Sequence, residues 1–121
     1  FTTVKRHGAL LAKGRMLGIQ FDTLFTDNLY FKISQHAIDM AMRIRSIFTK
    51  HDIKIAYNSP TNQQFVSLSP TLFDALSKNV AFEIWERKSN DEIICRFVTS
   101  WATKEAELDA LDNELNKLLK A

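Results

Sequence analysis

The sequence predicts an α+β fold in which a small, mainly antiparallel sheet is covered by helices, with a long N-terminal helix. Apolar residues recur at three- and four-residue steps in the first 50 residues and in the last 18. Short segments rich in β-branched and aromatic residues lie between these two regions. The predicted order is helix, helix, strand, strand, helix, strand, strand, helix.

The chain has the size and composition of one domain. Its 121 residues and 45% apolar content suit a single packed core. Basic and acidic residues are interspersed, with a net charge of +2, so we expect neither a nucleic acid nor a membrane as partner. The single cysteine, Cys95, favours a cytoplasmic location. Because the chain begins at Phe1, we expect it to be a piece of a longer protein.

Residues 1–26 are expected to form the N-terminal helix, although all three glycines fall among them. Each glycine inside a helix costs about 1 kcal/mol relative to alanine. We therefore expect either a close approach of the backbone to another surface or a non-helical entry. The glycines are Gly8, Gly14 and Gly18.

The second helix, over residues 28–50, has the clearest pattern. Asp27 or Asn28 is expected to cap it. One continuous apolar stripe predicts a buried face. The stripe consists of Ile33, Ala37, Met40, Ala41, Ile44, Ile47 and Phe48.

Two strand pairs follow. Residues 53–57 and 64–68 flank the turn "NSPTNQ", and residues 80–86 and 93–101 flank a polar stretch. Between the pairs, Ser69 and Pro70 predict the cap and first position of a short helix. The last helix is expected over 103–120, with Thr103 as its cap. Its buried seam consists of Leu108, Leu111, Leu115 and Leu118.

Arg96 is the most unusual residue of the late strand. If side chains alternate, Ile94, Arg96 and Val98 share one face. A dry guanidinium would favour a bound anion or a carboxylate partner, and its planar fork suits a carboxylate in two-point contact. The alternative, which the pattern alone favours, is an exposed arginine whose stem covers its neighbours and whose head reaches water.

Other candidate sites have equally simple alternatives. Lys13 and Arg15 flank Gly14 and could hold a phosphate, or lie on a solvated helix face. Thr61 and Asn62 stand at a strand entrance, where they could line a pocket or merely form a turn.

Several further residue types are expected to be structural. The three histidines are too far apart in sequence to predict a metal site. Cys95 is expected in the core, where apolar neighbours would raise its pKa. We expect Glu83 and Glu86 to be solvated residues of a strand and a turn.

Three segments carry a resemblance to a known family: "RHGALLAKGRMLGIQFDTLFTDNLYF", "SPTNQQF" and "CRFVTSWATKEAELDAL". Together they resemble the C-terminal small domain of the threonine aldolase and β-eliminating lyase family, which are pyridoxal-phosphate enzymes of fold type I. The resemblance spans nearly the whole chain. Its most specific parts are Thr61-Asn62 before a strand and Arg96-x-Val98-Thr99 before the last helix.

The resemblance implies roles for the candidate residues. Arg96 would bind the α-carboxylate of an amino-acid substrate, with Thr61 and Asn62 near its pocket. Arg15 and Lys13 would lie close to the phosphate of the cofactor. Trp101 stands where many threonine aldolases have histidine, which leaves retro-aldol cleavage and β-elimination both open.

The resemblance also implies that residues 1–121 are a single small domain of a larger enzyme. Residues 1–26 would link it to a missing large domain and pack on that domain. The lysine that forms a Schiff base with pyridoxal phosphate belongs to the large domain, so the fragment is expected to contain no catalytic residue, to bind no cofactor and to be inactive alone. The intact enzyme is expected to form a homo-oligomer.

Two other interpretations stay open at the level of sequence. The chain could be a stand-alone regulatory domain that binds a small molecule, with Arg96 gripping an acidic effector and the first helix mediating self-association. It could also be a structural interaction domain with Arg96 simply exposed.

Overall fold

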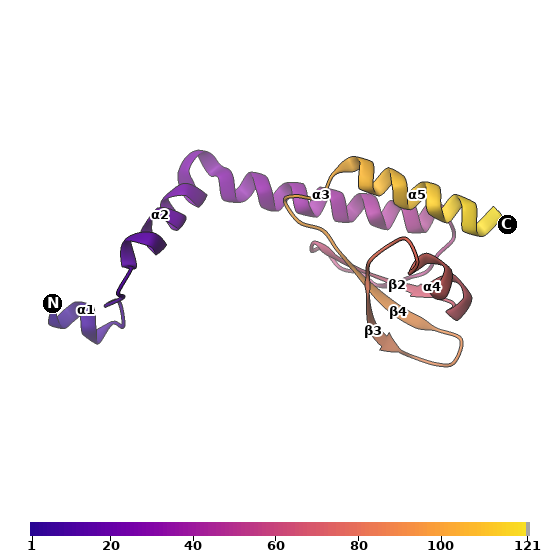
Figure 1. The fold of residues 1–121 in the computed structure, drawn as a ribbon, viewed down its shortest axis with the longest axis horizontal. Helices are drawn as coiled ribbons and strands as arrows, with labels where there is room; N and C mark the ends of the chain where they lie inside the picture. The colour runs from indigo at the N-terminus through magenta and orange to yellow at the C-terminus, as the bar shows by residue number, and fades with distance from the viewer. Residues whose placement is uncertain (121) are drawn as a thin grey trace. The chain divides into compact units, whose positions relative to one another are not determined.

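The computed structural model describes residues 1–120, in two compact units, of which the first is Phe1–Ile33 and the second begins at Ser34. The first unit contains α1 (Thr2–Arg6), α2 (Gly14–Phe25), the 3-10 turn η1 (Thr26–Asn28) and the start of α3 (Leu29–Lys50) (Figure 1). The second contains the rest of α3 and the sheet. None of the helices in residues 1–120 has the length and apolar character needed to cross a membrane.

The N-terminal segment differs from the single helix expected over residues 1–26. Gly8 has a φ of 68°, a left-handed conformation that glycine adopts readily, and α1 ends just before it. The next helix begins only at Gly14. Gly8 therefore marks a non-helical entry, whereas Gly18 lies inside α2, where an added Cβ would meet no described atom within 4 Å.

A second left-handed pair separates α2 from α3. Asp27 and Asn28, expected as helix caps, have φ values of 51° and 59°. Asp and Asn tolerate this conformation better than most residues. Just before them, the Thr26 hydroxyl donates to the Asp22 carbonyl at 2.7 Å. The chain therefore stops one helix and starts another within three residues.

The first unit buries none of its large apolar side chains. No residue of α1 or α2 is buried. Phe21 and Phe25 stack with their centroids 6.3 Å apart, yet both stay exposed. Such a surface is typical of a segment that another molecule or domain covers. The exposed side chains from α2 onward are Met16, Leu17, Ile19, Phe21, Phe25, Leu29, Tyr30 and Phe31.

The second unit is built on a four-stranded antiparallel sheet in the order β1-β2-β4-β3. The strands are β1 (Ile55–Tyr57), β2 (Gln63–Leu68), β3 (Glu83–Arg87) and β4 (Ile93–Val98). The central strands pair in unbroken register from Gln63 opposite Val98 to Leu68 opposite Ile93. Both expected hairpins are present, and the α+β class is confirmed.

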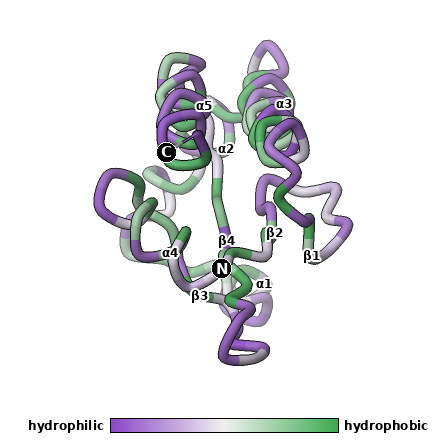
Figure 2. Tube along the Cα trace, turned by 90° about the vertical axis from the view of Figure 1, so that its right-hand side faces the viewer, coloured by the Kyte–Doolittle hydropathy of each residue, from purple (hydrophilic) through white to green (hydrophobic). Residues whose placement is uncertain are grey.

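Helices cover one face of this sheet. The part of α3 within the second unit and α5 (Glu105–Lys120) lie side by side over it, and α4 (Pro70–Leu76) joins them on the same side (Figures 1 and 2). Phe48 of α3 contacts Phe97 of β4, with centroids 4.8 Å apart. The predicted stripe of α3 and the leucine seam of α5 are buried except at Ile33 and Leu118, which are partly buried. The buried core is formed by Met40, Ile44, Ile47, Phe48, Ile53, Val66, Leu68, Leu76, Ile93, Cys95, Phe97, Leu108, Leu111 and Leu115.

Of the caps expected for α4 and α5, that of α4 is present and that of α5 is not. The Ser69 hydroxyl accepts a hydrogen bond from Leu72 N at 3.3 Å, with Pro70 in the first position of α4. Thr103, in contrast, accepts from Ser100 N at 2.9 Å and so closes the turn before the helix. The start of α5 is satisfied by Glu107, whose carboxylate accepts from Lys104 N at 2.9 Å.

Ion pairs join the end of α3 to the middle of α5. Asp112 accepts from Lys50 Nζ at 2.6 Å and lies 2.7 Å from Nε2 of His51. The hydrogen bond from Lys50, followed by that from His51, holds the pKa of Asp112 below its ordinary value. The ionised carboxylate is thus favoured in the folded chain.

Replacing Asp112 by asparagine tests this contact. A lowered folded pKa means that the carboxylate stabilises the fold above its unfolded pKa and that this stabilisation is lost as the pH falls through the folded pKa. We expect the Asp112→Asn variant to melt below wild type near about pH 6, and the difference to vanish near about pH 2. Circular dichroism at both pH values measures the melting temperatures. Asp91→Asn, which removes an exposed carboxylate from the β3–β4 turn, is the control, and an equal response of the two variants would contradict the assignment.

Candidate functional site

The candidate site lies on the face of the sheet opposite the helices, which we call the outer face. Along β2 and β4, Val66, Cys95 and Phe97 point into the core, and the residues between them point the other way. Phe65 and Glu83 both stand opposite Arg96, one on each neighbouring strand. The outer face carries Tyr57, Gln63, Phe65, Glu83, Trp85 and Arg96.

Arg96 is held by both neighbouring strands. Its Nη1 donates to Oε1 of Gln63 at 3.3 Å, and its Nη2 forms a short ion pair with Oε2 of Glu83. The guanidinium carbon lies 5.4 Å from the centroid of the Trp85 ring. The Arg96 side chain is 28% exposed. It is therefore neither the fully buried arginine nor the fully exposed arginine that the sequence left as alternatives. Its partner is a carboxylate.

One donor of Arg96 has no partner. The Nε atom is buried and makes no hydrogen bond with any described residue. A buried donor without an acceptor is unfavourable, because it has lost its water without replacement. The guanidinium therefore keeps one N–H donor that no described residue uses.

An aromatic row runs across the outer face beside Arg96. Tyr57 and Phe65 have centroids 5.6 Å apart, and Phe65 and Trp85 have centroids 5.2 Å apart, both in edge-to-face geometry. The Tyr57 hydroxyl donates to Glu86 at 3.0 Å, and this bond raises the pKa of Tyr57. The row gives Arg96 an apolar floor, with a cation–π contact to Trp85.

A β-bulge brings Glu83 to Arg96. At the turn end of the β3–β4 hairpin, Arg87 stands opposite Ile93 and Glu86 opposite Ile94. A regular ladder would continue with Ile84 opposite Arg96. The register shifts between Ile84 and Glu86, so Glu83 takes that place instead and Trp85 is the extra residue.

Glu83 and Gln63 were not predicted as partners of Arg96. Glu83 was expected to be solvated, and its side chain is indeed 67% exposed, yet it is paired. Alternation alone would have placed Ile84 near Arg96, because a single-residue bulge has no clear sequence signal. Gln63 has a weak signal, since it directly follows the Thr61-Asn62 pair.

Thr61 and Asn62 are engaged in the turn before β2. The Thr61 hydroxyl lies 2.9 Å from that of Ser59 and accepts from Gln63 N at 3.2 Å. Asn62 donates through Nδ2 to the Thr99 carbonyl at 2.7 Å, and its own carbonyl accepts from Thr99 N at 3.0 Å. The Asn62 amide thus joins the entrance of β2 to the end of β4.

Thr99 extends this connection into the core. Its side chain is buried, and its hydroxyl lies 2.6 Å from the Ala37 carbonyl of α3, to which it donates. Beyond it, Trp101 is 70% exposed and lies outside β4, because the strand expected over residues 93–101 ends at Val98.

Lys13 and Arg15 lie in the first unit, where α2 begins. Both are exposed, and Lys13 precedes the first residue of the helix. Two cations beside helix N–H groups suit the charge of a phosphate. A Cβ added at Gly14, between the two cations, would meet only the Leu11 side chain, at 3.9 Å.

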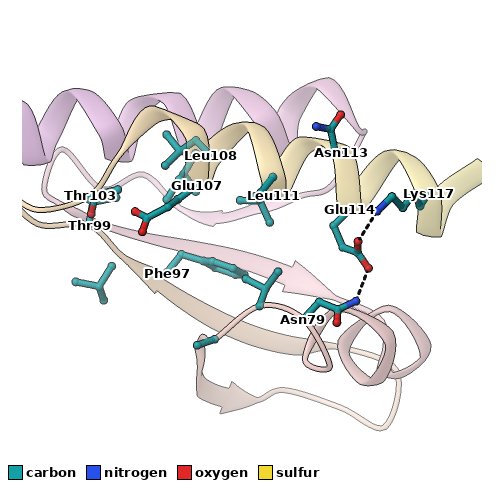
Figure 3. A pocket seen from close by; sticks show the side chains of 15 residues that line it. Asn79, Phe97, Thr99, Thr103, Glu107, Leu108, Leu111, Asn113, Glu114 and Lys117 are labelled. Carbon is teal, nitrogen blue, oxygen red and sulfur yellow. Dashed lines mark hydrogen bonds and ion pairs between the residues drawn. The ribbon is translucent and has the colours of Figure 1, made fainter.

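A hollow of about 730 Å³ lies elsewhere, between α5, the end of β4 and residues 79–81 (Figure 3). Phe97, Leu108 and Leu111 form its apolar floor. At one end of the hollow, the Glu114 carboxylate accepts a hydrogen bond from Asn79 at 2.8 Å, and this bond lowers the pKa of Glu114. Lys117 forms an ion pair with the same carboxylate at 3.4 Å. None of the five predicted site residues lines this hollow.

Cys95 is not a candidate nucleophile. It is fully buried in β4, and burial raises the pKa of its thiol to about 11. Its predicted place in the core is confirmed. Within residues 1–120, no three His, Cys, Asp or Glu side chains are grouped so as to hold a metal ion.

Comparison with known proteins identifies a similar solved structure. No protein-family profile matches the chain, and no curated protein does. A solved structure of threonine aldolase from Leishmania major superimposes with a TM-score of 0.87 and 35% sequence identity over 96% of this chain. The resemblance to the threonine aldolase family is confirmed. The chain spans 34% of the length of the Leishmania threonine aldolase, so about two thirds of that protein has no counterpart here.

Replacing Asn62 by alanine tests its role in joining β2 to β4. The Thr99 carbonyl would lose its bond from Nδ2. We expect a loss of about 1–2 kcal/mol in the free energy of unfolding, measured by urea denaturation. Asn90→Ala in the exposed β3–β4 turn is the control and should stay within about 0.5 kcal/mol of wild type. Unchanged stability of Asn62→Ala would contradict the structural role and leave the amide free for a ligand.

Proposed function

We propose that this chain is the C-terminal small domain of a pyridoxal-phosphate-dependent threonine aldolase or β-eliminating lyase that acts on amino acids. The observation that carries the proposal is the 35% identity to Leishmania threonine aldolase over 96% of the chain. An identity at this level extends the likeness beyond the fold to the side chains. The fold alone would not argue a reaction.

Arg96 is the proposed site for the substrate α-carboxylate. Its guanidinium is permanently charged, half-buried on an aromatic floor, and retains a donor without an acceptor. Two-point contact with a carboxylate fixes orientation as well as affinity. Orientation matters for this class of reaction because the bond to be broken must be aligned with the cofactor ring. Thr61 and Asn62 would shape the same end of the sheet, and their hydrogen bonds fix the turn that carries them.

Pyridoxal phosphate would supply the electron sink for cleavage next to the α-carbon. Lys13 and Arg15, at the start of α2, suit its phosphate. We assign the ring and the lysine that binds it to the other part of the enzyme, as the resemblance to the family implies. It follows that the 121-residue chain should bind amino acids only weakly and have no turnover.

The exposed first unit is the proposed contact with the large domain. It carries a row of apolar side chains from Met16 to Phe31 without burying any of them. A segment of this kind gains free energy when a second surface covers it. Residues 1–26 would thus link and pack on the large domain of a cytoplasmic homo-oligomer. We retain both aldol cleavage and β-elimination as reactions.

The sequence that precedes Phe1 gives the first test. We expect the coding region upstream of Phe1 to encode a large domain of roughly two hundred residues with a cofactor-binding lysine. Added pyridoxal phosphate should give the isolated chain no specific absorbance change beyond surface-lysine reaction, as measured by titration. A start codon directly before Phe1, or a specific spectrum with the isolated chain, would contradict the proposal.

Arg96→Gln in the intact enzyme tests the proposed site. Loss of a charged two-point contact should weaken amino-acid binding about 10- to 100-fold. The absorbance of the bound cofactor should be unchanged, since Arg96 is not assigned to the cofactor. Arg87→Gln, which removes the same charge from the neighbouring strand, is the control. It should bind both the amino acid and the cofactor as wild type does. Loss of cofactor with unchanged amino-acid affinity would overturn the assignment.

A further inference from the structure

We propose that Glu83 is a built-in competitor for the carboxylate of the substrate and thereby sets the affinity of the site for amino acids. This inference rests on the proposed function of Arg96 as the carboxylate site. Arg96 favours binding of the substrate carboxylate, whereas Glu83 opposes it.

The geometry gives Glu83 the position of a bound carboxylate. It stands directly opposite Arg96 in the β3–β4 ladder, and its Oε2 is paired with Nη2 of the guanidinium. The pairing is made by one oxygen on one nitrogen, while Nε remains without an acceptor. A free carboxylate that bonds both Nη2 and Nε would make one contact more than Glu83 does.

The two partners differ in how firmly they are held. Arg96 is 28% exposed and is also bound by Gln63 and by the Trp85 ring. Glu83 is 67% exposed, and Arg96 is the partner that the structure gives its carboxylate. Glu83 can therefore turn into water while Arg96 stays in place. A ligand would exchange with the movable carboxylate and leave the cation where it is.

The strength of the pair suits a competitor better than a permanent contact. An ion pair with one exposed partner contributes little, because water screens it and two side chains lose freedom. Such a pair lowers the affinity of a competing carboxylate by a factor of about five at most. This is enough to adjust affinity, and too little to close the site.

The experiment uses the 121-residue chain and acetate as the probe. Acetate binding is followed by NMR through the Nε–H signal of Arg96 at constant ionic strength, with chloride as the counter-titrant. The signal is identified by its loss in Arg96→Lys. The test variant is Glu83→Gln, which keeps the shape and removes the charge. The matched control is Glu86→Gln, which removes the same charge from the same strand but bonds Tyr57 and not Arg96.

We expect Glu83→Gln to bind acetate about three- to fivefold more tightly than wild type, and Glu86→Gln to change affinity by less than about twofold. Equal acetate binding by wild type and Glu83→Gln would overturn the inference while leaving Arg96 as a carboxylate site. An equal gain in acetate affinity in Glu83→Gln and Glu86→Gln would also overturn the inference, because the gain would then come from the change in net charge alone. No shift of the Arg96 signal in any variant would overturn the inference and also count against the proposed function of Arg96.

Discussion

The pairing of β2 with β4 is the contact on which the second unit depends. These two central strands run in unbroken register, and each sends alternate side chains to opposite faces. Val66 and Phe97 fill the core beneath the helices, whereas Phe65 and Arg96 meet on the outer face. A shift by one residue would exchange the two sets and expose the core. The same hydrogen bonds therefore fix both the packing and the candidate site.

Local patterns predicted most of this fold. The stripe of α3, the Ser69–Pro70 start of α4 and the leucine seam of α5 each arise from neighbours in sequence, where periodicity and capping are informative. The single helix expected over residues 1–26 is divided into α1 and α2 in the structure. The cost of glycine in a helix does not reveal where a helix breaks, so the sequence did not predict the position of this break. Gly8 marks that break through its left-handed conformation.

The candidate site was harder to predict than the fold. Arg96 was recognisable as an anomaly in an apolar strand, but its partners depend on pairing between strands far apart in sequence. Glu83 reaches it only through the bulge at Trp85. Asn62 was expected near a ligand, and the structure shows its amide bonded to the Thr99 carbonyl. Whether a polar side chain is free for a ligand is decided by these nonlocal contacts.

The bulge ties side-chain chemistry to chain length. Because Trp85 is the extra residue in β3, the same chain paired without the bulge would align the aliphatic side chain of Ile84 with the guanidinium. The arginine would then face a hydrocarbon where it now faces an acid. Deleting Trp85 would remove the bulge and still leave Glu83 opposite Arg96, so the acid depends on the bulge only while β3 keeps its present length.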